Sequence, residues 1–222
     1  MRKLIQLTSV VAILACAAPA FAGDGGFTLG LRTGYGMPLG TAGDGVKLGR
    51  LTWGAVPVQL DVGYRLLDNL EIGGYFSYGF AGLSSDARSA LEASGATKIS
   101  GHVVQRVGLQ ATYRLMPGNV IVPWATVGFG YEWLRYASAD VSTPNGTDEL
   151  EVGFGGLEAS LTLGAEYEIA PSFAVGPYLG LSAGRYDRHL ATVDAAGASD
   201  GSVGSKALHE WLSVGVKATY RL

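Results

Sequence analysis

Residues 56–80 decide the fold, and they read VPVQLDVGYRLLDNLEIGGYFSYGF. From Val56 to Leu66, apolar residues occupy every second position, and the positions between them are mainly polar or glycine. The alternation resumes at Leu70, after a short turn signal at residues 67–69. A period of two is the period of a β-strand with one apolar and one polar face. Two such runs joined by a tight polar turn predict a β-hairpin.

The same pattern recurs along the whole chain. A short motif with a central tyrosine stands shortly before each tight turn and again at the chain end. These tyrosines are Tyr64, Tyr113, Tyr167 and Tyr220, spaced 49, 54 and 53 residues apart. With the first run from Phe27 and the last run to Leu222, the alternating segments number eight. An even number of antiparallel strands can close into a barrel.

Four longer segments rich in Gly, Ala, Ser, Thr and Asp separate the hairpins: Met37–Arg50, Gly82–Lys98, Arg135–Val152 and Asp187–Lys206. Short turns at one rim and long polar loops at the other are typical of outer-membrane barrels. We therefore predict an all-β fold, an eight-stranded antiparallel up-and-down transmembrane β-barrel with short periplasmic turns and longer extracellular loops. One domain, residues 23–222, accounts for the whole pattern.

Glycine indicates which face of each strand points outward. The chain holds 34 glycines in 222 residues, and within the strands they gather on the polar face, whereas the apolar face carries bulky side chains. Because the interior of an eight-stranded barrel barely has room for side chains, the polar face is expected inside. Soluble up-and-down barrels show the inverse arrangement.

Aromatic residues are expected in two belts. The four motif tyrosines form one belt near the short turns, and the other lies near the long loops: Phe76, Tyr78, Phe80, Phe129, Tyr131 and Trp133. Such belts mark the two membrane interfaces, where a ring buries its body and keeps its polar tip wet. The alternative is ordinary cross-strand aromatic pairing in a soluble sheet.

The first residues predict export. Arg2 and Lys3 precede an apolar run from Leu4 to Ala18, and Ala20-Phe21-Ala22 supplies the small residues of a cleavage site. This run is shorter than the roughly 20 residues of a transmembrane helix, so residues 1–22 are expected to be a signal peptide cleaved near Ala22. Lipoprotein processing at Cys16 is the alternative, although bulky Leu14 fits it poorly. Cleavage near Ala22 removes the single cysteine, so disulfides cannot stabilise the exported chain.

The final segment, SVGVKATYRL at residues 213–222, alternates up to the chain end. With this segment and the strand layout, the mature chain resembles the small eight-stranded outer-membrane barrels, the OmpA/OmpX-like and opacity-protein-like group. The resemblance implies an integral protein of the cell outer membrane, in contact with lipid and lipopolysaccharide. It also implies a C-terminal strand read by the barrel-assembly machinery, although Leu222 stands where an aromatic residue is usual.

The polar faces of the strands carry six cationic and six acidic side chains: Arg32, Arg65, Arg106, Arg114, Lys217, Arg221, Asp61, Glu71, Glu132, Glu158, Glu166 and Glu168. Unpaired charges are costly in a narrow interior, so we predict a hydrogen-bonded ion network that plugs the lumen. The alternative is a narrow gated channel for ions or small solutes, in which Arg32, Asp61, Arg106 and Lys217 form a switchable middle layer.

A second alternative is an enzyme that acylates or deacylates lipid A, which would need a nucleophile beside a base. His209 and Ser213 share a strand face but are four residues apart, about 13 Å along the strand. His102 and His189 have no serine partner fixed by spacing. We therefore predict no catalytic residue, no cofactor and no metal site.

The remaining expectation is a structural or surface-interaction role for a monomer, with the outer loops available to an extracellular ligand. Without Arg2 and Lys3 the mature chain has 14 basic against 19 acidic side chains, a net charge of −5. Nucleic acid is not an expected partner at that balance.

Overall fold

The computed structural model describes residues 26–143, 146–193 and 197–222, so the predicted signal peptide lies outside the described residues. The strands are β1 (Phe27–Gly43), β2 (Val46–Lys47), β3 (Thr52–Leu67), β4 (Leu70–Leu83), β5 (Thr97–Arg114), β6 (Ile121–Thr143), β7 (Gly146–Ala170), β8 (Phe173–Val193), β9 (Gly197–Ser202) and β10 (Leu208–Arg221). A 3-10 turn, η1 (Leu48–Arg50), and a short helix, α2 (Ser85–Ala93), complete the described elements. Neither of these helical segments has the length and apolarity needed to cross a bilayer.

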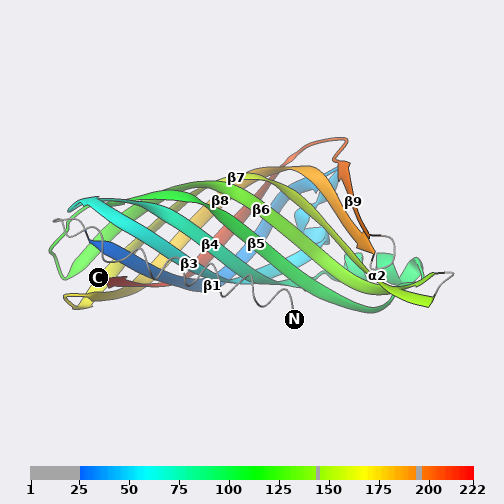
Figure 1. Cartoon of the computed structure of the whole chain (residues 1–222), viewed down its shortest axis with the longest axis horizontal. Coiled ribbons are helices and arrows are strands. Elements are labelled where there is room, and N and C mark those ends of the chain that lie inside the picture. Colours follow the sequence, from blue (N-terminus) through cyan, green and yellow to red (C-terminus); the bar gives the residue numbers. More distant parts are fainter. Residues whose placement is uncertain (1–25, 144–145, 194–196) are drawn as a thin grey trace.

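In the described part of the chain, eight strands form a closed antiparallel ring in the order β1, β3, β4, β5, β6, β7, β8, β10 (Figure 1). The ring closes because β10 pairs with both β1 and β8, with Leu31 opposite Ala218 and Leu212 opposite Leu181. The predicted eight-stranded barrel is confirmed. Closure lets the backbone N–H and C=O groups of the first and last strands form hydrogen bonds with each other. Hydrocarbon requires this, because it offers those groups no other hydrogen-bond partner.

The two ends of the barrel differ as expected, but the long segments are not open loops. Strand β1 runs on to Gly43, β6 and β7 continue as one hairpin to Thr143 opposite Gly146, and β8 continues to Val193 beside β9. The strands therefore extend into segments that were expected to be loops, and the loops are shorter than predicted. Beyond the hydrocarbon the outward face need not be apolar, so the hydropathy alternation fades while the backbone pairing continues.

The segment between β4 and β5 holds helix α2 in place of a strand extension. Its N-cap is Ser84, whose hydroxyl oxygen accepts a hydrogen bond of 3.1 Å from the backbone N–H of Ala87. In Figure 1, α2 and β9 lie at the same end of the barrel, opposite the end that holds the short turns and the C-terminus.

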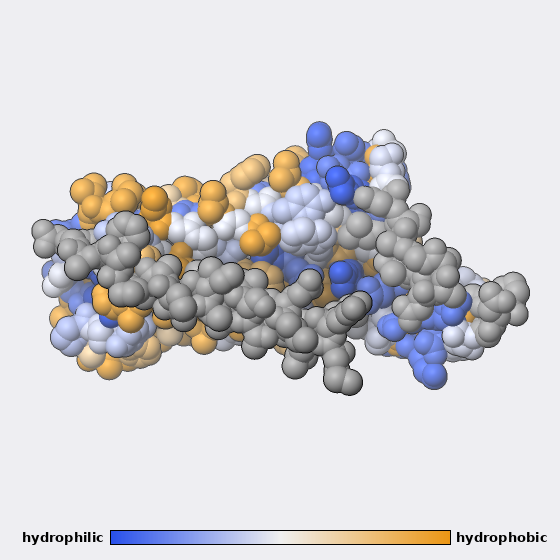
Figure 2. Space-filling model, in the orientation of Figure 1, coloured by the Kyte–Doolittle hydropathy of each residue, from blue (hydrophilic) through white to orange (hydrophobic). Residues whose placement is uncertain are grey.

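Large apolar side chains face outward around the middle of the barrel. Leu109 is 74% exposed, Val127 58% and Leu161 47%, whereas the neighbouring inward residue Glu158 is 3% exposed. Figure 2 shows these hydrophobic surfaces over the half of the barrel with the short turns and hydrophilic surfaces at the other end. The predicted orientation, with the apolar face outward, is therefore confirmed.

Glycines oppose one another across neighbouring strands on the inner face. Gly63 lies opposite Gly73, and Gly34 lies opposite Gly215. A Cβ atom placed on Gly73 would clash with the carbonyl oxygen of Val62, and one on Gly215 would clash with that of Thr33. These positions need glycine because the facing backbone comes too close for any side chain.

We predict that Gly73→Ala lowers the free energy of unfolding by roughly 1–3 kcal/mol, since the added methyl group must displace backbone. Gly74→Ala is the matched control, because its Cβ would lie 3.4 Å from the Gly108 carbonyl oxygen, near ordinary contact. Urea unfolding of both variants from lipid vesicles measures the difference. Equal stability of the two variants would contradict the close-approach explanation.

Candidate functional site

The twelve predicted charges all lie on the inner face of the barrel. Eight of them are buried, namely Arg32, Asp61, Glu71, Arg114, Glu132, Glu158, Glu166 and Lys217. Arg65, Arg106, Glu168 and Arg221 are partly buried. They divide into three layers along the barrel axis, which we call the periplasmic, middle and outer layers.

The periplasmic layer lies beside the short turns and holds Arg65, Glu71, Arg114, Glu168 and Arg221. Arg114 Nη2 lies 2.9 Å from Glu71 Oε2, and Arg221 Nη1 lies 2.6 Å from Glu168 Oε1. Arg65 makes no ion pair with any residue that the structure describes. This layer therefore has three cations for two carboxylates.

The middle layer contains one pair built on strands β1 and β3. Arg32 Nε donates to Asp61 Oδ2 at 2.6 Å, and Arg32 Nη2 donates to Gln110 Oε1 at 3.1 Å. The second carboxylate oxygen of Asp61 accepts from Gln59 Nε2 at 2.8 Å. Both charges are thus paired and further hydrogen-bonded, the condition under which burial of an ion pair is tolerated.

A second middle-layer pair joins β10 to β7. Lys217 Nζ lies 3.1 Å from Glu166 Oε1, which also accepts a hydrogen bond of 2.7 Å from the Thr219 hydroxyl. The Lys217 ammonium lies 4.4 Å from the ring centroid of buried Trp124, and the Arg32 guanidinium lies 5.5 Å from the same ring. Trp124 therefore offers a cation–π contact to each of two cations.

The outer layer centres on Arg106 between two carboxylates. Arg106 Nε donates to Glu132 Oε2 at 2.6 Å and lies 3.3 Å from Glu158 Oε2. The Arg106 guanidinium also lies 5.2 Å from the ring centroid of Trp211. One cation pairs with two carboxylates in this layer, whereas cations outnumber carboxylates in the periplasmic layer.

Tyrosine and tryptophan donors complete the surroundings of Glu132. Its Oε1 accepts from the Tyr186 hydroxyl and, at 3.2 Å, from Trp211 Nε1. His209 Nε2 lies 3.5 Å from the same oxygen, and its ring stacks on Tyr186 at a centroid distance of 3.7 Å. Aromatic groups therefore help to hold a fully buried carboxylate in the interior.

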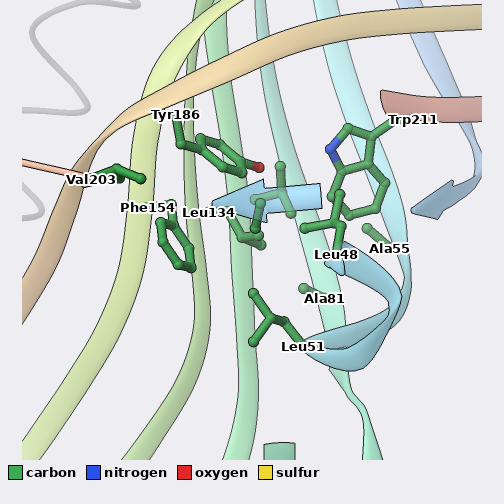
Figure 3. Packing of buried hydrophobic residues seen from close by; sticks show 11 residues of the cluster. Leu48, Leu51, Ala55, Ala81, Leu134, Phe154, Tyr186, Val203 and Trp211 are labelled. Atoms are coloured by element: carbon green, nitrogen blue, oxygen red, sulfur yellow. The ribbon is translucent and has the colours of Figure 1, made fainter. Parts of the chain in front are cut away.

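An apolar cluster fills the barrel above the outer layer (Figure 3). We call it the outer-end cluster, and its members are Ala42, Leu48, Leu51, Ala55, Ala81, Val104, Leu134, Phe154, Tyr186, Val203 and Trp211. Leu48 comes from η1 and is fully buried, as are Leu134 of β6 and Ala42 of β1. Full burial of one leucine contributes about 1.5–3 kcal/mol. Residues outside the regular strand walls thus close the outer end.

Asp44 forms contacts that hold the segment containing Val203 in place. Its carboxylate accepts from the Ser205 backbone N–H at 2.7 Å, and His189 Nε2 lies 3.1 Å from the other carboxylate oxygen. The Ser205 hydrogen bond and the neighbouring His189 lower the pKa of the Asp44 carboxyl below its usual value. Asp44 thereby links the β1–β2 turn to the segment before β10.

A small cavity of about 60 Å³ lies between the middle and outer layers. Its walls include Arg32, Arg106, Gln110, Ser160 and Ser182. This volume is enough for a few water molecules held by polar partners. Because Arg32 and Arg106 are paired with carboxylates, widening the cavity at either residue would disturb an ion pair.

The structure adds residues that the sequence analysis did not single out. Trp124, Tyr186 and Trp211 are buried inside the barrel. The alternation with a period of two predicts that they point inward, because Trp124 shares a strand face with Thr126 and Trp211 shares one with Ser213. Leu48 could not be found in this way, since it lies in a 3-10 turn.

The residues of the channel hypothesis are divided between two adjacent layers that share the small cavity, and the residues of the enzyme hypothesis form no joint site. Among the four residues of the channel hypothesis, Arg106 belongs to the outer layer, whereas Arg32, Asp61 and Lys217 belong to the middle one. The Ser213 hydroxyl donates to the Gly180 carbonyl oxygen at 3.3 Å, while His209 contacts Glu132.

The contacts of His189 in the described part of the chain do not place it beside a nucleophile. His189 pairs with Asp44, and the side chain of His102 lies outside the described residues. Within the described ranges, no group of three or more His, Cys, Asp or Glu side chains could hold a metal ion.

Comparison with known proteins gives the family. The outer membrane protein beta-barrel domain matches residues 8–188. The chain belongs to this family. As a member of it, the protein is placed in the outer membrane. No curated protein matches the chain.

Solved structures of the same architecture resemble this family member. A major outer membrane protein from Thermus thermophilus is 14% identical, with a TM-score of 0.56, 90% of this chain covered and 100% of that one. Neisserial surface protein A is 12% identical, with a TM-score of 0.47 and coverages of 86% and 95%. Ail, the attachment invasion locus protein of Yersinia pestis, is 13% identical, with a TM-score of 0.44 and coverages of 91% and 100%. The likeness to the Thermus thermophilus protein, at 14% identity, concerns the fold alone.

We predict that Arg106→Met lowers the free energy of unfolding by about 3–5 kcal/mol, because it leaves Glu132 and Glu158 buried without a cation. Adding Glu158→Gln to this variant should restore part of the loss, since it removes one of the two stranded charges. Urea unfolding from lipid vesicles, followed by tryptophan fluorescence, measures both effects. The control is Arg50→Met, because Arg50 is exposed and pairs with Asp86 outside the barrel. An Arg106→Met cost no larger than that of the control would contradict this assignment.

Proposed function

We propose that the protein is a non-enzymatic outer-membrane barrel with a structural or surface-interaction role and a plugged lumen. The observation that carries the proposal is the filled interior, where three layers of charged groups are followed by the outer-end cluster. A solute would have to pass Arg32–Asp61, then Arg106 with its two glutamates, and then Leu48. A barrel of this kind stabilises the envelope and presents its outer end to other molecules.

The energetics favour a permanent plug. Separating a buried pair such as Lys217 and Glu166 would leave each charge buried without a partner, which costs several kcal/mol. Opening a path would need more than one such separation, in addition to exposure of the outer-end cluster. The network therefore supports a static filling better than a gate.

The partners follow from the two surfaces. The outward leucines, valines and aromatic residues fit outer-membrane lipid and lipopolysaccharide, and β10 has the alternating face that the barrel-assembly machinery would read. The extended β6–β7 hairpin and helix α2 form the outer end, where a ligand outside the cell would bind. Partner specificity would lie in these segments, since surface segments carry binding functions on rigid scaffolds.

A narrow gated channel is the second candidate, and the cavity of about 60 Å³ between the middle and outer layers is the observation that favours it. The cavity is polar and could form part of a water path. It ends at the outer-end cluster, where the described wall and turn residues are apolar.

We predict that the purified protein gives no steady conductance in a planar lipid bilayer, because the plug blocks ions. A shift in gel mobility on boiling shows that the sample is folded, and an open porin in the same lipid is the positive control. A steady conductance that changes in Arg106→Ala would defeat the plug and favour the channel.

A further inference from the structure

The charges of the barrel interior are equal in number but unevenly distributed. The middle layer is balanced, with Arg32 and Lys217 against Asp61 and Glu166. The outer layer has one cation for two carboxylates. The periplasmic layer has three arginines for two inner-face carboxylates, and a third carboxylate, Asp68, is exposed at its rim.

Two arginines of the periplasmic layer have hydrogen-bond donors without acceptors. Arg114 is 3% exposed, and Nε, Nη1 and Nη2 of its guanidinium are buried without a hydrogen bond. Glu71 lies within ion-pair distance of Arg114 but in a geometry that makes no hydrogen bond. The Nε atom of Arg65 is likewise buried and unbonded. Buried donors of this kind are expensive unless an acceptor satisfies them.

These donors surround a small cavity that lies beside the short turns. The cavity measures about 50 Å³, and its lining includes Arg65, Arg114 and Arg221 together with Pro117 and Gly118 of the β5–β6 turn. Two carboxylates also line it: Glu168, which is paired with Arg221, and Asp68, which is exposed at the rim. The turn residues place the cavity at the periplasmic mouth of the barrel.

We propose that this cavity is an anion site for a phosphate group. Guanidinium groups present planar forks of N–H donors that match phosphate oxygens, and they hold such anions more strongly than neutral donors do. A bound phosphate would supply acceptors for the unbonded nitrogens of Arg65 and Arg114. The phosphate could be a free ion or the headgroup of a lipid from the periplasmic leaflet.

The test uses inorganic phosphate and the full mature barrel in phosphorus-free maltoside micelles. Binding is followed by the broadening of the phosphate ³¹P resonance as the protein is titrated at constant ionic strength. The variant is Arg65→Gln, since Arg65 is only partly buried and has no ion pair to lose among the described residues. Arg50→Gln is the matched control because it removes an arginine at the opposite end of the barrel. Gel mobility before and after boiling confirms that each variant is folded.

We expect saturable broadening that Arg65→Gln weakens about tenfold or more and Arg50→Gln leaves unchanged. Absence of saturable broadening for the unaltered protein, or an equal response of the two variants, would overturn the site. Short-chain phosphatidylglycerol added to the same micelles distinguishes the sources. Displacement of phosphate supports a headgroup ligand, and an unchanged phosphate signal supports the free ion. The conductance of the barrel is a separate observable, so this site can fail while the plug stands.

Discussion

The narrow interior of a closed eight-stranded sheet is the constraint on which the rest of the structure depends. Hydrocarbon outside requires that the first and last strands pair, because an open edge would leave backbone groups without hydrogen bonds. Closure at eight strands leaves little space inside. The inner positions therefore take glycine, as in the Gly63 and Gly73 pair, or long charged side chains that pair with one another, as Arg32 and Asp61 do.

The same constraint explains how much the sequence could predict. Alternation along each strand depends on the two faces of a sheet, so strand positions, the outward leucines and the inward charges follow from the sequence alone. The pairing of each cation with a particular carboxylate does not follow from the sequence, because it depends on the stagger between strands. Arg106 pairs with Glu132, its neighbour across the sheet, but Lys217 reaches Glu166, on a strand that is not its neighbour.

The outer end was the least predictable part. The alternation of hydropathy ends where the hydrocarbon ends, although the strands β6 and β7 continue well beyond that point. Leu48 and Val203 come from irregular segments, and their burial depends on how those segments fold back over the barrel. The closure of the outer end by an apolar cluster, and the link from Asp44 to Ser205, are therefore tertiary features that no local pattern encodes.

Uneven distribution of charge gives the two ends of the barrel different chemistry. The outer layer holds Glu132 with tyrosine and tryptophan donors and leaves one nitrogen of Arg106 unbonded, whereas the periplasmic layer leaves all three guanidinium nitrogens of Arg114 and the Nε of Arg65 without acceptors. This difference is compatible with an inert middle and with binding at the two ends.

Alternating accessibility along one strand tests the orientation of the barrel most directly. Single cysteines at residues 109–113, each carrying a nitroxide label, can be probed in lipid vesicles for collisions with dissolved oxygen, which concentrates in the hydrocarbon. An outward apolar face predicts high accessibility at Leu109 and low accessibility at Gln110, repeating with a period of two. The opposite phase, or an absence of alternation, would contradict it.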